Sequence, residues 1–394
     1  MTPFGADPDV VWRRLIHGDT ATRWLSSEGD CGSPNQPAGA PATGIRAQGS
    51  EPLITMACHA AAHAMSDAQL PSNGTNPDRF GCVIGTSKGG LRSFRHHFRG
   101  RSPADNPAQS WQQCFPDAPS QHVAALLGIR GPLLCPVAAC ATGLVSLIRG
   151  ADLIRDGACD VVIAGSTDAS LLDVVQGSFR RLGVLARNFD DPARGCRPFA
   201  ADRTGFLIGE GAAVLVLERL DHARSRQARP YAEWTGHGLA ADPAGITSVD
   251  VSGEALARLI SDTLHRVPCP PDKVDYVNLH GTATTQNDLA ETRAVRAAFG
   301  AAADGVSCSA FKGALGHLLG AAGSVETALT VLAMKHGIVP PTANLLHPDV
   351  QCNLDYTAEG CRRRPIDTAM KLSLGFGGHL AAVVLQRPDD INCR

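Results

Sequence analysis

The sequence lacks any run of about 18 consecutive apolar residues, and no basic segment followed by an apolar stretch lies near Met1. We therefore expect neither a membrane span nor a secretory leader. It also lacks a sustained cluster of Lys and Arg, and its formal net charge is -2. Charge therefore gives no reason to expect nucleic acid or a membrane surface as the main partner.

Cysteine is plentiful but lacks metal-binding spacing. The 13 cysteines form no CxxC pair and are scattered, several of them in apolar stretches such as Phe80–Ile84. This distribution argues against a disulfide framework and against a zinc site. It favours buried thiols in a reducing compartment, and we predict a cytoplasmic protein without a metal ion.

The glycine-rich segments lack the spacing of nucleotide sites. Gly85–Gly90 does not have the spacing of a phosphate-binding loop, and Gly205–Gly211 does not open a helix after a strand, as a dinucleotide site requires. We predict turns at both places.

What is present is a large apolar core. Of the 394 residues, 44% are hydrophobic and 19% charged, which suits one large domain or two fused ones. Continuous apolar runs predict strands that are buried on both faces. They are Phe80–Gly85, Asp160–Gly165, Ala212–Glu218, Asp275–Leu279 and Leu380–Gln386. Helical periodicity predicts helices at Pro8–Ile16, Ala141–Arg155 and His317–Lys335.

The order of strands and helices before about Arg219 is roughly repeated after it. We predict two α/β halves, residues 1–219 and 220–394, stacked as layers of helix, sheet, helix, sheet and helix. Ser26–Ser50, rich in Gly, Pro, Ser and Ala, is predicted to be a long surface loop.

Cys140 is a candidate nucleophile. An apolar strand, a turn of small residues and an apolar helix beginning at Cys140 are predicted around it. A helix N-terminus favours the thiolate and should lower the pKa of the thiol towards neutrality. Its own backbone N–H is also available to an oxyanion. For Cys140 alone, the alternative is a buried thiol that packs as a small apolar residue.

Two histidines strengthen this candidate. His280 ends an apolar strand and is followed by glycine and hydroxyl residues, whereas His317 opens an Ala/Gly-rich helix. Two neutral imidazoles and a sulfur suit a reaction in which a thioester enolate develops, because both Nε2 atoms can donate to its oxygen. Either histidine alone would more often be a capping or core residue, and it is the joint pattern that points to a site.

These segments resemble the ketoacyl synthase family of the thiolase-like superfamily. The likeness runs in family order through most of the chain. It is carried by Gly131–Gly143, Arg203–Gly211, His280–Thr284, Lys312–Gly323 and Gly375–Gly378. The resemblance implies a five-layered α-β-α-β-α fold, a homodimer, and substrates carried on the phosphopantetheine of an acyl carrier protein, with no other cofactor.

The resemblance also implies roles for individual residues. Cys140 is the acylated nucleophile, His280 and His317 assist malonyl decarboxylation, and Lys312 and Glu326 form a supporting charge network. Further residues are expected to bind substrate. Phe376 gates the acyl pocket and completes the oxyanion hole with Cys140. Thr282 and Thr284 contact the pantetheine arm, Phe179 lines the pocket, and Gly375 and Gly377 lie beside the substrate.

Histidine rather than asparagine at 317 favours the elongating type of synthase, and the retained Cys140 argues against the chain-length-factor branch. Two departures stand out. Met1 lies almost on the segment that follows the family's first strand, so we expect a central strand to be missing. Ser50–His59 replaces the usual basic helix. A weaker docking site for the carrier is expected at Arg99, Arg101, Arg180 and Arg181, for which a solvated face is the alternative.

Three functions remain open at this stage. The first is fatty acid elongation by a 3-oxoacyl-(acyl-carrier-protein) synthase. The second is a discrete ketosynthase of a polyketide or polyene pathway. The third is a non-catalytic subunit that pairs with a ketosynthase as a heterodimer.

Overall fold

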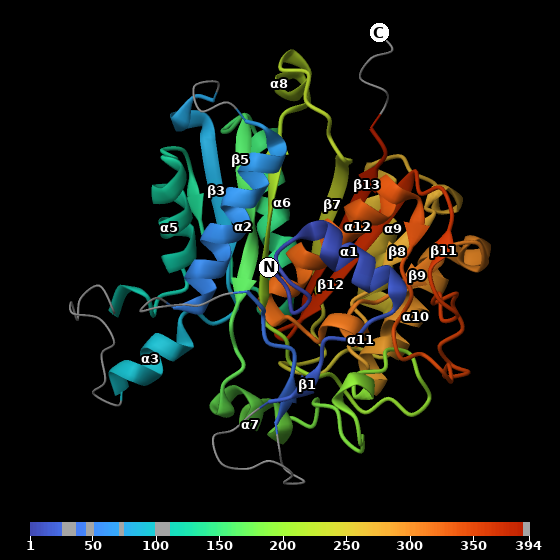
Figure 1. Ribbon diagram of the computed structural model, residues 1–394. Coiled ribbons are helices and arrows are strands. Elements are labelled where there is room, and N and C mark those ends of the chain that lie inside the picture. Colours follow the sequence, from blue (N-terminus) through green and yellow to red (C-terminus); the bar gives the residue numbers. More distant parts are fainter. Residues whose placement is uncertain (26–36, 45–50, 71–74, 99–110, 389–394) are drawn as a thin grey trace.

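The structure is a computed structural model that describes residues 1–25, 37–44, 51–70, 75–98 and 111–388. Two sheets dominate it, one built from the first half of the sequence and one from the second (Figure 1).

The first sheet has the strand order β4-β3-β5-β6. Its bounds are β3 Phe80–Gly85, β4 Leu133–Leu134, β5 Val161–Asp168 and β6 Gly211–Glu218. β3 is parallel to β4 and β5, while β6 is antiparallel to β5. Every residue of β3 and β5 is buried, as the continuous apolar runs predict for strands covered on both faces.

The second sheet repeats this pattern with one strand more, in the order β7-β13-β12-β8-β9. Its bounds are β7 Glu233–Ala241, β8 Tyr276–Asn278, β9 Ser307–Ser309, β12 Thr368–Gly375 and β13 His379–Gln386. β12 runs parallel to β8 and antiparallel to β13, and β7 is antiparallel to β13 on its far side. β13 therefore corresponds to β6, and β7 has no counterpart among the described strands of the first sheet.

Helices complete the five layers (Figure 1). α2 Pro52–Ala68 and α5 Ala118–Leu127 cover the outer face of the first sheet. α6 Thr142–Arg155 and α12 Ala322–His336 lie between the sheets. α9 Glu254–Arg266 and α10 Thr285–Phe299 cover the second sheet. The thiolase-like fold implied by the sequence is thereby confirmed.

The remaining elements surround this core. Asp7 caps the N-terminus of α1 Pro8–His17, and Gly18 ends the helix in a left-handed conformation. Two short hairpin-like pairs join β1 Arg23–Trp24 to β2 Ala38–Gly39 and β10 Ile338–Val339 to β11 Arg362–Arg363. The other helices are α3 Leu91–Phe98, α7 Asp173–Arg181, α8 Leu220–Ser225 and α11 Lys312–Leu315.

Residues 52–59, within the segment that replaces the family's basic helix, belong to α2. Two expectations need correction. The helix predicted from His317 begins as an α-helix only at Ala322. The centre of the first sheet is also complete, because β3 and β5 occupy it. Among the described residues, the position without a strand is instead at the outer edge of β6. The predicted loop Ser26–Ser50 lies mostly outside the described residues. Within the described part, no helix is both long and apolar enough to cross a bilayer.

Candidate active site

The two central helices meet at their N-termini, and this contact brings the two halves together. A Cβ on Gly143 of α6 would lie 2.5 Å from the backbone nitrogen of Ser324. A Cβ on Gly323 would lie 2.3 Å from the backbone nitrogen of Leu144. No side chain fits between such backbones, so glycine at both positions allows the segments carrying Cys140 and His317 to approach.

Cys140 lies in a 3₁₀ turn, Ala139–Ala141, immediately before α6. The side chain of Thr142 holds this turn: its hydroxyl accepts from the Ala138 N–H at 2.9 Å and donates to the Ala139 carbonyl at 2.8 Å. The sulfur is therefore placed close to a helix N-terminus, as predicted. Cys140 is a free thiol and only 7% exposed.

The predicted lowering of the Cys140 pKa is wrong. Burial raises the pKa of the thiol to about 11, and the nearby carboxylate of Asp168 also raises it. Lys88, Lys312 and a hydrogen bond from the Phe376 N–H act in the opposite direction but do not outweigh burial. The resting form is therefore the thiol.

His317 is held against the first half by its backbone. Its N–H donates to the Leu207 carbonyl at 2.7 Å, and its carbonyl accepts from the Gly209 N–H at 2.8 Å. The Nδ1 atom of its ring accepts the Leu319 N–H at 3.2 Å. Nδ1 is therefore unprotonated, so the proton of the neutral ring is on Nε2.

His280 follows β8 and is held by a buried carboxylate. Glu291 of α10 accepts the backbone N–H groups of His280 at 2.6 Å and Gly281 at 2.7 Å. The His280 and His317 rings lie 5.4 Å apart between centroids, at an interplanar angle of 85°. Both imidazoles are thus brought into one site.

Both histidines are neutral. Their pKa values lie well below the usual range, chiefly because they are buried and secondly because the Lys312 ammonium is close. Lys371 lowers the pKa of both rings further. A neutral ring can donate one hydrogen bond without being a strong acid.

A buried charge network lies behind His280. The Lys312 ammonium donates to the His280 carbonyl and to Glu326, the latter at 2.7 Å. Lys371 of β12 binds the other oxygen of Glu326 at 2.6 Å. The predicted pairing of Lys312 with Glu326 is present, whereas Lys371 was missed. A lysine inside the apolar strand Thr368–Gly375 was the signal for it.

Aromatic side chains form one wall of the site. The Phe206 ring meets the His317 ring edge to face at 4.7 Å between centroids, and Phe179 lies 5.9 Å from Phe206. Phe179 also stacks on Phe376 at 6.1 Å. Cys140, Phe179 and Phe206 belong to one apolar cluster, against which Phe376 packs. The sequence analysis found Phe179 and Phe376 but not Phe206.

Lys88 is a third residue that the sequence analysis did not single out. Its ammonium contacts the hydroxyls of Ser87 at 2.6 Å and Ser170 at 3.3 Å, and lies 3.7 Å from Asp168. It is near enough to lower the pKa of both Cys140 and His317. The site therefore combines an apolar wall with a cation close to the nucleophile.

Of the remaining predicted residues, the threonines and glycines lie beside the Cys140 cluster and the described arginines do not. Thr282 and Thr284 join their hydroxyls at 2.8 Å beside Ala283, which packs in the cluster around Cys140. Gly375 and Gly377 flank Phe376, and a Cβ on Gly375 would meet the Cys140 nitrogen at 3.2 Å. Arg180 and Arg181 are exposed at the end of α7. Arg99 and Arg101 lie outside the described residues.

Backbone strain accompanies each of the three central side chains. Ala139 before Cys140, Ala283 after His280 and Leu319 after His317 all have positive φ, at 47°, 59° and 49°. Residues with a Cβ adopt this conformation only when their surroundings enforce it, and they cluster at functional sites. Among the described residues, no group of three or more His, Cys, Asp or Glu side chains is arranged to hold a metal ion.

A buried thiol and two neutral imidazoles, joined where two similar α/β halves meet, define a thiolase-like condensing site. Family models agree with this class: Beta-ketoacyl synthase, N-terminal domain, matches residues 1–223, and Beta-ketoacyl synthase, C-terminal domain, matches residues 231–346. The chain belongs to the β-ketoacyl synthase family.

Curated relatives span nearly the whole chain. It is 36% identical to the tetracenomycin polyketide synthase ketoacyl synthase alpha subunit of Streptomyces glaucescens, over 98% of this chain and 95% of that protein. It is 33% identical to 3-oxoacyl-[acyl-carrier-protein] synthase 2 of a Synechocystis species, over 98% and 96%. The polyketide ketosynthase and the 3-oxoacyl-[acyl-carrier-protein] synthase are therefore similar to this chain at nearly the same sequence identity.

Solved structures of ketosynthases have the same fold as this chain. A type II PKS acyl-carrier protein in complex with its ketosynthase bound to the hexaketide matches with a TM-score of 0.90 and 28% identity, over 98% of this chain and 97% of that one. The ishigamide ketosynthase/chain length factor matches with a TM-score of 0.88 and 26% identity, over 98% and 97%.

Proposed function

We propose that this chain catalyses a decarboxylating Claisen condensation between an acyl group on Cys140 and a malonyl unit on an acyl carrier protein. The observation that supports it best is the pair of neutral imidazoles, His280 and His317, gathered with a buried thiol. A site that must hold an enolate needs donors that do not protonate carbon, and neutral imidazoles meet that need.

The first step is thioester exchange. The Cys140 sulfur attacks the acyl carbonyl of a carrier thioester, the carrier thiolate leaves, and the thiol proton of Cys140 passes to it. Because the pKa of the thiol is raised to about 11, proton loss accompanies attack rather than preceding it. The N–H groups of Cys140 and Phe376 hold the developing oxyanion.

The second step uses the histidines. Malonyl thioester loses carbon dioxide, and the Nε2–H groups of His280 and His317 hold the enolate oxygen. The enolate carbon then attacks acyl-Cys140, whose sulfur leaves, and a 3-oxoacyl thioester forms. Decarboxylation itself supplies the carbanion, so the proposal includes neither a metal nor a redox cofactor. Thr282 and Thr284 contact the pantetheine arm, and Phe179, Gly375 and Gly377 border the acyl group.

The proposed partners are an acyl carrier protein and a second ketosynthase-like chain. β4 is an outer strand of its sheet, and Leu133, Leu134 and Val137 beside it are 43%, 39% and 53% exposed. Apolar side chains on a free edge favour pairing with another chain, either identical or related. Arg180 and Arg181 at the end of α7 are proposed to attract the acidic carrier.

The acyl chain can come from fatty acid elongation or from a polyketide pathway, and Lys88 favours the second. A saturated acyl chain would remove water from a cation beside the nucleophile and offer it no new partner. An acyl chain that carries keto oxygens can instead bind the cation. Competition between hexanoyl- and acetoacetyl-carrier tests this. The Lys88→Met variant should shift the preference at least tenfold towards hexanoyl if Lys88 binds acyl oxygens. An unchanged ratio would return the choice to fatty acid elongation.

Intact mass tests the central proposal. After incubation with acyl-carrier protein, the wild-type chain should gain one acyl group, and the Cys140→Ala variant should gain none. A wild-type chain that gains no mass would identify a non-catalytic partner subunit instead. Full condensing activity in Cys140→Ala would remove the assignment.

A further inference from the structure

Lys371 is a fully buried lysine in the middle of a strand. It lies in β12, and its side chain is 0% exposed. Lysine is almost never buried to this extent unless it is paired, because an ammonium group loses its hydration there. In the register of the second sheet, Lys371 and Asn278 form the last pair between β12 and β8. The ladder between these two strands therefore ends immediately before Leu279 and His280.

The side chain of Lys371 continues the contact where the ladder ends. Its Nζ atom donates to the Leu279 carbonyl at 3.4 Å, to the Leu372 carbonyl at 2.6 Å and to the Glu326 carboxylate at 2.6 Å. Three acceptors call for three N–H groups, which an ammonium group has and a neutral amine does not. Lys371 is therefore bound as the cation, although burial lowers its pKa.

Two lysines thus hold two consecutive carbonyl groups. Lys371 binds the carbonyl of Leu279, and Lys312 binds that of His280. The Glu326 carboxylate joins the two ammonium groups, with one oxygen for each. Glu326 is the fifth residue of α12, the helix that follows the segment of His317. One lysine side chain therefore ties β12 both to the segment of His280 and to the helix next to His317.

The ring of His280 depends on its backbone for its position. The Nδ1 atom of His317 accepts the Leu319 N–H, whereas among the described residues the Nδ1 atom of His280 has no hydrogen-bond partner. Glu291 holds the His280 backbone from one side, by accepting its N–H at 2.6 Å. The carbonyl groups on the other side are held by the two lysines, so these bonds decide where the ring lies.

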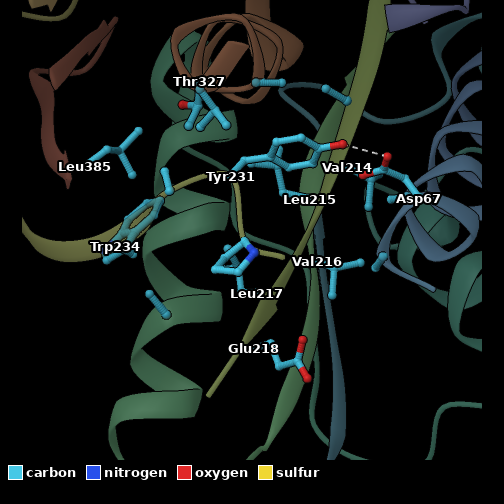
Figure 2. Close-up of a pocket in the computed structure, with 18 of the residues that line it drawn as sticks. Asp67, Val214, Leu215, Val216, Leu217, Glu218, Tyr231, Trp234, Thr327 and Leu385 are labelled. Atoms are coloured by element: carbon cyan, nitrogen blue, oxygen red, sulfur yellow. Dashed lines mark hydrogen bonds between the residues drawn. The ribbon is translucent and has the colours of Figure 1, made fainter. Parts of the chain in front are cut away.

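The three charged side chains are also closed off from the largest pocket. Figure 2 shows this pocket beside β6, with a volume of about 2400 Å³ and Thr327 at its border. Glu326 is the residue before Thr327, but neither it nor Lys312 nor Lys371 lines the pocket. Each of the three is at most 2% exposed. Their positions are therefore set by contacts among themselves and with the His280 segment.

We propose that Lys371 is a positioning residue of the condensing site, which fixes the His280 segment to β12 and α12 so that the Nε2–H groups of His280 and His317 converge on one enolate oxygen. The inference rests on the proposed function and deepens the part that His280 plays in it. Lys371 does not touch substrate and acts through the Leu279 carbonyl and Glu326. Acyl transfer to Cys140 does not use His280, so the loss of Lys371 should impair only the second step.

Separate measurement of the two steps tests the proposal. In Lys371→Met, decarboxylation of malonyl-carrier should slow at least about tenfold, because a misplacement of about 1 Å can cost about a hundredfold in rate. Acyl transfer to Cys140, followed by intact mass, should stay within about threefold of wild type, because eight pairs with β13 still hold β12 in place. Equal losses in both steps, or decarboxylation at the wild-type rate, would overturn the proposal.

Lys335→Met is the matched control, because it removes an exposed ammonium group from the last turn of α12. It should leave both steps unchanged. Lys371→Gln is a second variant, for the case that Lys371→Met does not fold. It keeps hydrogen-bond donors but not the charge, and it should show the same difference between the two steps at a smaller size.

Amide exchange tests the positioning independently of activity. The N–H groups of residues 279–281 are all hydrogen-bonded, to Ser309 and to Glu291. In Lys371→Met their exchange should quicken at least about tenfold, while exchange in β3 and β5 stays as in wild type. Unchanged exchange at 279–281, or an equal increase in β3 and β5, would overturn the proposal.

The two measurements together separate this inference from the proposed function. Faster exchange at 279–281 with normal decarboxylation would overturn the inference and leave the proposed function intact. A wild-type chain that neither accepts an acyl group nor decarboxylates malonyl-carrier would overturn both.

Discussion

The Nδ1 atom of His317 accepts the backbone N–H of Leu319, two residues further along the chain. This bond is possible because Leu318, with a φ of -76° and a ψ of 13°, turns the next N–H back towards the ring. The imidazole is thereby fixed as the tautomer with its proton on Nε2. A local backbone conformation thus determines which atom is available to substrate.

The first prediction concerns the protonation of His317. Its pKa lies well below the usual value, so below about pH 6.5 the unfolded chain binds a proton that the folded chain does not. The free energy of unfolding of the wild type therefore falls by up to about 1.4 kcal/mol for each pH unit of acidification. The His317→Gln variant lacks that loss.

Urea unfolding from pH 7.5 to 5 checks this. The stability of His317→Gln relative to wild type should rise as the pH falls, whereas the exposed His265→Gln should show a much smaller trend. The comparison with wild type is needed because two buried carboxyl groups have raised pKa values, about 6 for Asp288 and about 7 for Glu291. Both groups take up protons in the folded state first, so they increase the stability of both proteins as the pH falls. A constant difference for His317→Gln would contradict a depressed pKa.

The second prediction concerns the Cys140 thiol. With a pKa raised to about 11, its rate of alkylation by iodoacetamide should increase about tenfold for each pH unit between 7 and 10. Peptide mapping by mass spectrometry measures this, with exposed Cys361 as the internal reference. Lys88→Met should slow alkylation further, because the Lys88 ammonium lowers the pKa. A rate independent of pH above 7 would show that the helix N-terminus dominates over burial.

Much of the site was predictable because its residues stand where apolar strands or helices end. Cys140 and His280 occupy such places, and burial of the adjoining segments brings them together. Phe206 and Lys88 were not predictable, because neither belongs to a periodic pattern and each acquires its role from residues distant in the sequence.

The strands likewise could be predicted only where the sequence pattern is local. Phe80–Gly85 and Ala212–Glu218 were predicted because they are continuous apolar runs. β7 was missed because Gly236 and Gly238 interrupt it. A Cβ on them would lie 1.9 Å from a Val267 methyl carbon and 2.5 Å from the Thr263 hydroxyl, so tertiary packing against α9 and its end dictates glycine. β12 was missed because Lys371 breaks its apolar run, and only the distant Glu326 explains that lysine.

The third prediction concerns this buried network. Lys312, Lys371 and Glu326 are each at most 2% exposed, and the Glu326 carboxylate binds both ammonium groups. Glu326→Gln should destabilise the protein by about 3–5 kcal/mol, because it leaves buried cations without a counterion. Lys371→Met should cost less, because the pair of Lys312 and Glu326 stays matched. Urea denaturation at pH 7.5 measures both, and an equal or smaller cost for Glu326→Gln would show that the network is not charge-paired.

The fourth prediction concerns the loop that carries Phe376. A Cβ on Gly375 would lie 2.6 Å from the Ala138 carbonyl and 3.0 Å from the Ala141 nitrogen, so Gly375→Ala must push the loop away from the Cys140 turn. The Phe376 N–H, which donates to the sulfur, would move with it, and loss of one oxyanion donor costs about a hundredfold in rate. We expect acyl transfer to Cys140 to slow by that factor, while circular dichroism shows the same fold.

Gly177→Ala is the control for this change, because its Cβ would meet nothing within 4 Å and a helical alanine is favourable. It should leave acyl transfer unchanged, as followed by intact mass over time. Iodoacetamide separates the two possible causes of a slow Gly375→Ala. If alkylation of Cys140 stays within about threefold of wild type while acyl transfer falls, the lost function is oxyanion binding rather than access to the sulfur. Equal losses in both would place the defect in the Cys140 turn itself and contradict the assignment of Phe376.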